Sequence, residues 1–204
     1  MKVEPREFMN DNQKKGVRPK AQAKRITPGK KILAPVGFAY KQKNDRKVLE
    51  IAYVCIKDLD KRKEEGGIFI DNFIISSRMQ WKIANLAIGM DYTDAFDDEE
   101  HADVQKVLDS NTFIGVFIEK TFNGNPYTDI KYYNRNWNQE KDGDGFPVFS
   151  VEEDKLISRG EEDWKNLRKY RASQPEKYGH YEADPLPSGS GVSDEEYEGS
   201  ELPF

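Results

Sequence analysis

The sequence predicts a mainly β fold for the central part of the chain, flanked by disordered tails. Five segments between residues 31 and 135 carry the β-branched and aromatic residues typical of strands, and one segment with helical spacing lies between the third and the fourth. Towards both ends, the composition shifts to charged, amide, Pro, Gly and Ser residues, which do not bury enough apolar surface to fold.

The first three strands should form an antiparallel meander. The first covers residues 31–40 (KILAPVGFAY), where Pro35 favours an edge or a bulge because it has no N–H to donate to a neighbouring strand. A polar turn separates it from the second strand, 47–56. The third strand, 68–76 (IFIDNFIIS), follows a second polar loop.

A helix and a hairpin complete the central part. Residues 77–90 have apolar side chains at helical spacing. The stretch 91–109 is strongly acidic and is expected to be a solvated insert, with a second half compatible with a helix. Residues 112–122 and 127–135 both alternate as strands, and the intervening Asn-Gly-Asn-Pro has turn chemistry, which predicts a closing hairpin.

The resulting element order, β-β-β-α-β-β, is that of an OB-fold, a five-stranded Greek-key barrel with a helix between strands 3 and 4. Helical periodicity returns over residues 151–172, with an expected break near Gly160. The predicted organisation is a disordered basic arm (1–29), an OB-fold-like domain (30–149) with an acidic insert (91–109), a helical extension (150–173) and a disordered acidic tail (174–204).

The charged residues are segregated along the chain. The formal net charge is −5, which by itself argues against binding to phosphates. Residues 1–31, however, contain ten basic and three acidic side chains, whereas residues 174–204 contain one basic and eight acidic ones. Oppositely charged ends are typical of tails that interact with other molecules, so the net charge does not exclude a nucleic-acid partner.

Several classes of protein are excluded or disfavoured by the composition. No apolar run approaches the roughly 18–20 residues that a transmembrane helix needs, and the N-terminus lacks the apolar core of a secretory signal. The single Cys55 cannot form an internal disulfide, and its apolar surroundings predict a buried structural thiol. We therefore expect a protein of a reducing cytoplasm, with no membrane association, no cofactor and no bound metal ion.

The closing hairpin combines aromatic and basic side chains. Strand alternation in 127–135 would place Tyr127, Lys131, Tyr133 and Arg135 on one face. Single-stranded nucleic acid requires this combination, because each base stacks on a ring for about 1–3 kcal/mol while cations follow the backbone. The alternative is that half of the rings fill a small core and the cations are ordinary surface charges. The expected binding residues, including loop cations, are Lys43, Lys47, Arg62, Phe113, Phe117, Tyr127, Lys131, Tyr133 and Arg135.

The chain ends in an acidic segment with an apolar terminus, 193–204 (SDEEYEGSELPF). The terminal Pro-Phe pair places a pre-bent aromatic anchor beside the free α-carboxylate, which suits an apolar pocket with a basic rim on a partner protein. The expected partner-binding residues are Asp194, Glu195, Glu196, Glu198, Glu201, Leu202, Pro203 and Phe204.

This tail closely resembles the C-terminal tip of bacterial and phage single-stranded DNA-binding proteins. Residues 31–135 are also similar to phage-encoded members of this family, through the strand pattern, the segment 75–82 (ISSRMQWK) leading to Leu86 and Gly89, and the turn 122–127 (FNGNPY). The chain departs from the common bacterial pattern in its basic arm, its acidic insert and its helical stretch before the tail. Because of these departures, the usual tetramer is not implied, although a homo-oligomer is compatible with the sequence.

The resemblance implies a non-enzymatic OB-fold protein that binds single-stranded DNA without sequence preference. Such a protein protects DNA during replication, recombination and repair, in the host cytoplasm if it is phage-encoded. Its tip would recruit a polymerase, recombinase, helicase or primase.

Two other interpretations remain open. The first is an enzyme: Asp129 and Lys131 match the acid-x-Lys pattern found in Mg²⁺-dependent nuclease sites, with Asp71 or Glu119 as further metal ligands. The chain could also be a protein–protein adaptor that docks through its tail and does not bind DNA.

Overall fold

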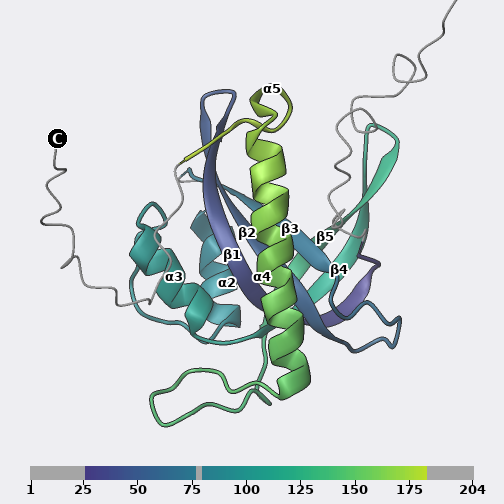
Figure 1. The fold of residues 1–204 in the computed structure, drawn as a ribbon, viewed down its shortest axis with the longest axis vertical. Coiled ribbons are helices and arrows are strands. Elements are labelled where there is room, and N and C mark those ends of the chain that lie inside the picture. Colours follow the sequence, from purple (N-terminus) through teal and green to yellow (C-terminus); the bar gives the residue numbers. More distant parts are fainter. Residues whose placement is uncertain (1–25, 77–79, 183–204) are drawn as a thin grey trace, which may run out of the picture.

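A computed structural model describes residues 26–76 and 80–182 (Figure 1). Within these residues, no helix is both long and apolar enough to span a membrane. The elements are β1 (Gly29–Lys43), β2 (Arg46–Asp58), β3 (Ile68–Ile74), α2 (Gln80–Gly89), α3 (His101–Asp109), β4 (Phe113–Phe122), β5 (Asn125–Arg135), α4 (Val151–Ala172), α5 (Pro175–Tyr178) and β6 (His180–Tyr181).

The strands form one open antiparallel sheet in the order β3-β2-β1-β4-β5, and β6 pairs with β1. The mainly β fold class is thus confirmed. The sheet is not closed into a barrel, because the described strands include no backbone pairing between β3 and β5. Side chains connect these two edges instead: the Tyr133 hydroxyl donates to Asp71 Oδ2, and Lys82 Nζ of α2 lies 2.5 Å from Asp71 Oδ1.

The first strand is central in the sheet, since it pairs with both β2 and β4. Its pairing with β2 shifts register between Pro35 and Gly37. Of the two positions that Pro35 favoured in the sequence, the bulge is therefore the one adopted, because a proline cannot donate to the ladder of an interior strand.

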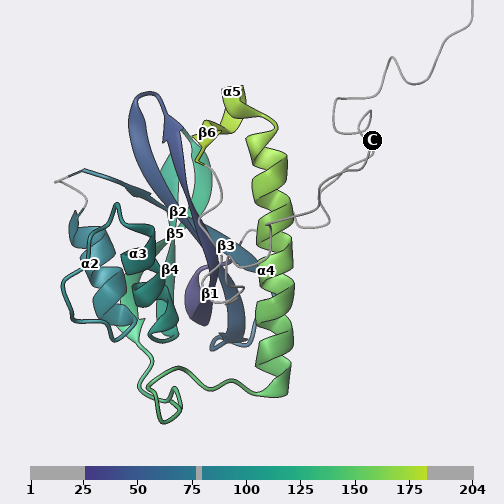
Figure 2. The same cartoon turned by 60° about the vertical axis from the view of Figure 1, so that its left-hand side comes forward.

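The two faces of the sheet are covered by different helices. Figure 2 shows α4 on one side and α2 with α3 on the other. The larger core lies between the sheet and α2 and α3, and the smaller core lies between the sheet and α4. Because β2 is buried on both faces, Cys55 is fully buried and burial raises its pKa to about 12, as expected for a structural thiol.

The acidic insert differs from its expected solvated form. Its second half is the helix α3, as the sequence suggested. The residues Val104, Val107 and Leu108 on one side of α3 are buried in the larger core. Their spacing of three and four residues gives α3 one apolar face, so this part of the insert is a structural layer.

The helix α4 covers the range that its periodicity predicts and begins with a capping box between Ser150 and Glu153. The expected break at Gly160 does not occur. A Cβ at Gly160 would lie 2.9 Å from Val36 Cγ1 and 3.0 Å from Val54 Cβ, so this glycine allows the helix to approach the sheet closely. Tertiary packing therefore explains a residue that local propensity interprets as a helix breaker.

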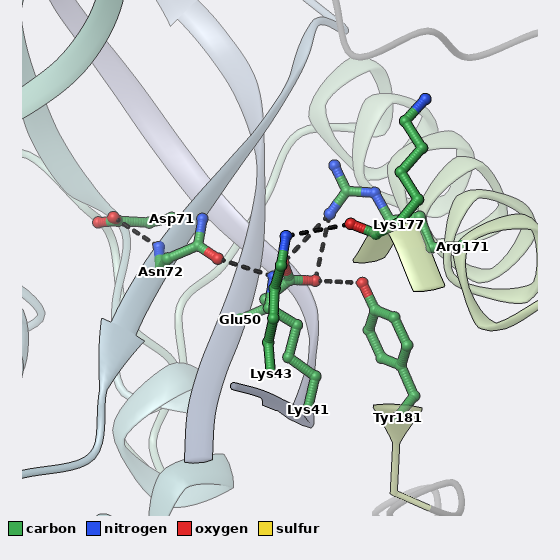
Figure 3. A network of polar contacts seen from close by, with 8 residues as sticks. All are labelled: Lys41, Lys43, Glu50, Asp71, Asn72, Arg171, Lys177 and Tyr181. Carbon is green, nitrogen blue, oxygen red and sulfur yellow. Dashed lines mark hydrogen bonds and ion pairs between the residues drawn. The ribbon is translucent and has the colours of Figure 1, made fainter. Parts of the chain in front are cut away.

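A polar network holds the end of α4 and β6 against the sheet (Figure 3). Glu50 of β2 is fully buried and accepts from Arg171 Nη1 at 3.2 Å and from the Tyr181 hydroxyl at 2.7 Å. Lys41 Nζ also donates to Glu50 and lies 3.1 Å from the Asn72 side-chain oxygen. The carboxylate thus joins β1, β2, β6 and α4.

The boundaries of the ordered fold differ from those expected. Ile26 is buried and Thr27 N–H donates to Glu64, so the fold begins before the expected start near Lys30. At the other end, α5 and β6 replace the first part of the tail that we expected to be disordered from Gln174. The rest of the basic arm (1–25) and of the acidic tail (183–204) lies outside the described residues.

Candidate nucleic-acid interface

A bulge in β5 determines which side chains of the β4–β5 hairpin share a face. Tyr132 pairs with Val116 and Ile130 pairs with Phe117, so Lys131 is an extra residue between them. The bulge reverses the alternation of the strand. Residues before and after it that strict alternation would separate therefore lie on the same face.

Tyr127 and Tyr132 consequently point to the outside of the sheet. They pair with Lys120 and Val116, which alternate on one face of β4. The exposed fractions are 42% for Tyr127, 52% for Tyr132 and 70% for Phe122, which follows Lys120 on the same face. We name this surface the outer hairpin face; it comprises Lys120, Phe122, Tyr127, Lys131 and Tyr132.

Each tyrosine of the outer hairpin face has a cation beside it. Lys131 Nζ lies 5.0 Å from the centroid of the Tyr132 ring. Lys120 stands opposite Tyr127 and its Nζ lies 2.6 Å from Asp129 Oδ2. The arrangement therefore offers ring surface for stacking and positive charge for phosphates on an exposed sheet face.

Three of the predicted binding residues face inward instead. Phe113 and Phe117 are buried in the larger core, where Phe113 packs edge-on against Tyr53 with ring centroids 5.1 Å apart. Tyr133 packs against the same core, and burial together with the nearby Asp71 carboxylate raises its pKa. For Tyr133 the cause is the bulge in β5, which strand alternation does not reveal. For Phe113 and Phe117 the alternation of β4 is regular, and the face that carries them packs on the core instead of facing solvent.

The predicted cations are distributed over different parts of the fold. Lys43 and Lys47 flank the β1–β2 turn; Lys43 Nζ donates to the Lys177 carbonyl at 3.0 Å, and Lys47 Nζ lies 3.6 Å from Glu182. Arg62 is exposed in the β2–β3 loop at the opposite end of β2. Arg62 therefore does not join the other predicted residues in one surface.

Arg135 is held beside an aromatic side chain that the sequence did not single out. Its Nη2 lies 2.6 Å from Asp91 Oδ1, and its guanidinium lies 4.0 Å from the centroid of the Trp137 ring. Trp137, Tyr132 and Phe122 are exposed rings on or next to the hairpin that sequence reasoning missed. A search of the sequence for aromatic residues one or two positions from a cation would have found Trp137 and Tyr132.

The residues of the alternative nuclease site are occupied by other contacts. Lys120 pairs with Asp129, while Lys82 and Tyr133 bind Asp71. Lys131 lies over the Tyr132 ring. Among residues 26–76 and 80–182, no three His, Cys, Asp or Glu side chains are grouped as ligands for a metal ion.

The described part of the chain ends close to the β1–β2 turn. β6 pairs with Lys41 and Gln42, and Glu182 N–H donates to the Tyr40 carbonyl at 2.9 Å. The predicted tip, Asp194 to Phe204, lies beyond the described residues, and its expected partner contacts stay a prediction. In comparisons with known proteins, no family model matches the chain and no curated protein matches it.

Proposed function

We propose that this protein binds single-stranded DNA without sequence preference, through the outer hairpin face. The observation that carries the proposal is the pairing of exposed rings with cations on that face. Every base has a π-face, so stacking on Tyr127 and Tyr132 tolerates any sequence, while Lys131 attracts the phosphates. Protection of exposed strands and recruitment of replication or recombination proteins through the acidic tip follow as part of the same proposal.

The strand order supports this proposal. The path β3-β2-β1-β4-β5, with α2 between β3 and β4, is compatible with a partly open OB-type barrel. In such barrels the loops between strands 1 and 2 and between strands 4 and 5 contact oligonucleotides. Here the corresponding turns lie at the same end of the molecule in Figures 1 and 2. Because α4 covers β1 and β2, the β4–β5 hairpin remains the exposed part of the sheet.

Binding should depend on the two tyrosines of the outer hairpin face. Replacing both Tyr127 and Tyr132 with alanine removes two stacking surfaces, each worth about 1–3 kcal/mol, so affinity for a dT oligonucleotide should fall by about thirtyfold or more. Fluorescence anisotropy with labelled oligo-dT and with duplex DNA, each across a salt series, measures this loss. For the wild-type protein we expect preference for the single strand and a steep dependence on salt.

The matched control is Phe146→Ala, which removes an exposed ring (55%) from the loop between β5 and α4. It should leave affinity unchanged. Equal affinity of the wild-type protein for both DNA forms would contradict the proposal. If the double variant binds DNA as tightly as the wild type and unfolds at the same point, the outer hairpin face is not the binding site. Absence of any DNA binding would favour the adaptor alternative.

Removal of residues 193–204 should tighten binding at low salt. The last described residue, Glu182, is bonded to β1 near the basic β1–β2 turn, and the acidic residues that follow it in the sequence would compete with phosphates for nearby cations. The gain should vanish at high salt, because screening weakens both interactions. Titration of full-length and truncated proteins at two salt concentrations tests this, and equal low-salt affinities would contradict it.

A further inference from the structure

Trp137 is the most exposed large apolar side chain in the described part of the chain, at 76%. It lies two residues beyond the end of β5. A single exposed apolar side chain is common on protein surfaces and carries no meaning alone. What distinguishes Trp137 is how its backbone and one face of its ring are held.

The turn that carries Trp137 is anchored by buried hydrogen bonds. The neighbouring Asn136 is buried, and its side-chain amide donates to Thr112 Oγ1 at 2.8 Å. Thr112 in turn donates to the Gln139 side-chain oxygen at 2.7 Å, and Gln139 N–H donates to the Asn136 carbonyl at 3.2 Å. These bonds hold the backbone on both sides of Trp137, so the indole is presented from a rigid support.

A positioned guanidinium covers part of the indole. Arg135 lies 4.0 Å from the ring centroid, and Asp91 holds it through an ion pair of 2.6 Å. Asp91 also binds Lys141 Nζ at 3.1 Å. Two cations surround one carboxylate, so the cluster keeps an excess positive charge beside the ring. An aromatic surface next to positive charge is the combination that single-stranded nucleic acid recognises.

The same pairing of ring and cation recurs along β5. Tyr127, Tyr132 and Trp137 follow one another at intervals of five residues. Five residues of an extended strand span about 16 Å. Arg135 pairs with Phe113 and therefore lies on the opposite face of β5 from Tyr132, so a DNA strand bound at the tyrosines would pass around the end of β5 to reach Trp137.

We infer that Trp137, with Arg135 beside it, is a second base-stacking position for single-stranded DNA at the end of β5. This inference rests on the proposed function, because it extends the same ligand along the same strand. The class of ligand is an unpaired nucleobase with its phosphate, and Lys141 and Arg135 supply the positive charge.

Tryptophan fluorescence of the full chain tests the inference. The protein has three tryptophans: Trp137, the exposed Trp81 (60%) and the buried Trp164 (4%). Base stacking quenches indole emission. In a Trp81→Phe variant, oligo-dT should therefore quench the emission, whereas in a Trp137→Phe variant, which retains Trp81, it should not. Quenching that persists in Trp137→Phe would overturn the inference.

Affinity provides the second measurement. Trp137→Ala should weaken binding to a long oligo-dT by about five- to hundredfold, as expected for one lost stacking surface, while Trp137→Phe should keep most of the affinity because it retains a ring. Trp81→Ala is the matched control and should bind as the wild type does. If the wild type binds DNA and the Tyr127→Ala/Tyr132→Ala variant binds more weakly, but Trp137→Ala does not, then the inference about Trp137 fails and the proposed function stands. If the wild type does not bind, the proposed function fails with it.

Discussion

Replacing Glu50 with alanine is expected to destabilise the fold by about 3 kcal/mol, near the lower end of the range for breaking a buried ion pair. The carboxylate is fully buried and binds Arg171, Lys41 and Tyr181. Without it, two cations and a hydroxyl would lose their partner in a site of low polarity. The Arg171 and Lys41 side chains are 19% and 11% exposed, so water compensates for part of the loss.

Urea unfolding measures this change as a lower midpoint with an unchanged slope. The matched control is Glu99→Ala, which removes a carboxylate of 59% exposure that lies 4.0 Å from Lys47. Surface pairs of this kind contribute about 0–1 kcal/mol, so the control should unfold close to the wild type. Equal midpoints for the two variants would show that the network around Glu50 does not hold α4 and β6 to the sheet.

Replacing Trp164 with alanine should lower the free energy of unfolding by about 3–5 kcal/mol, the usual effect of truncating a buried aromatic side chain to alanine. Trp164 is only 4% exposed and is the largest side chain of the smaller core between α4 and the sheet. It fills the space above Gly37, where a Cβ would lie 2.6 Å from Trp164 Cδ1. The opposing position is a glycine with φ of +145°, so it offers no side chain to fill the cavity.

Thermal unfolding followed by circular dichroism measures this loss. Trp137→Ala provides the comparison, since it removes the same side chain from an exposed position and should change stability by no more than about 0.5 kcal/mol. Gly160→Val provides a second perturbation, because its side chain would collide with Val36 and Val54 and push α4 from the sheet. If Trp164→Ala unfolded at the wild-type temperature, α4 would not be docked through this residue.

The regular elements of this fold could be predicted because their signals are local. β2, β3, the β4–β5 hairpin, α2 and α4 each have a periodicity or a turn that their own residues specify. The bulge at Pro35 could also be anticipated, since a missing N–H is a property of that residue alone. In contrast, α5 and β6 lack such a signal, and they form where Glu50 and β1 provide hydrogen-bond partners.

The residues of the outer hairpin face were predicted only in part, because the face depends on register. Tyr127 and Lys131 were identified and are exposed, whereas Tyr133, which was grouped with them, lies on the other face and packs on the core. One extra residue in β5 is enough to exchange the two faces, since side chains alternate with a period of two. A pairing register is a property of two strands together, and neither strand specifies it alone.

The sequence by itself determined the mainly β class, the positions of most strands and helices, the opposite charges of the two ends and the apolar tip. These depend on composition and local spacing, which are properties of each segment by itself. The tertiary structure alone decided that the sheet stays open, that α4 packs on it through Gly160 and Trp164, and that Tyr132 and Trp137 are exposed. These features arise from contacts between segments distant along the chain, where packing and hydrogen bonding override local preference.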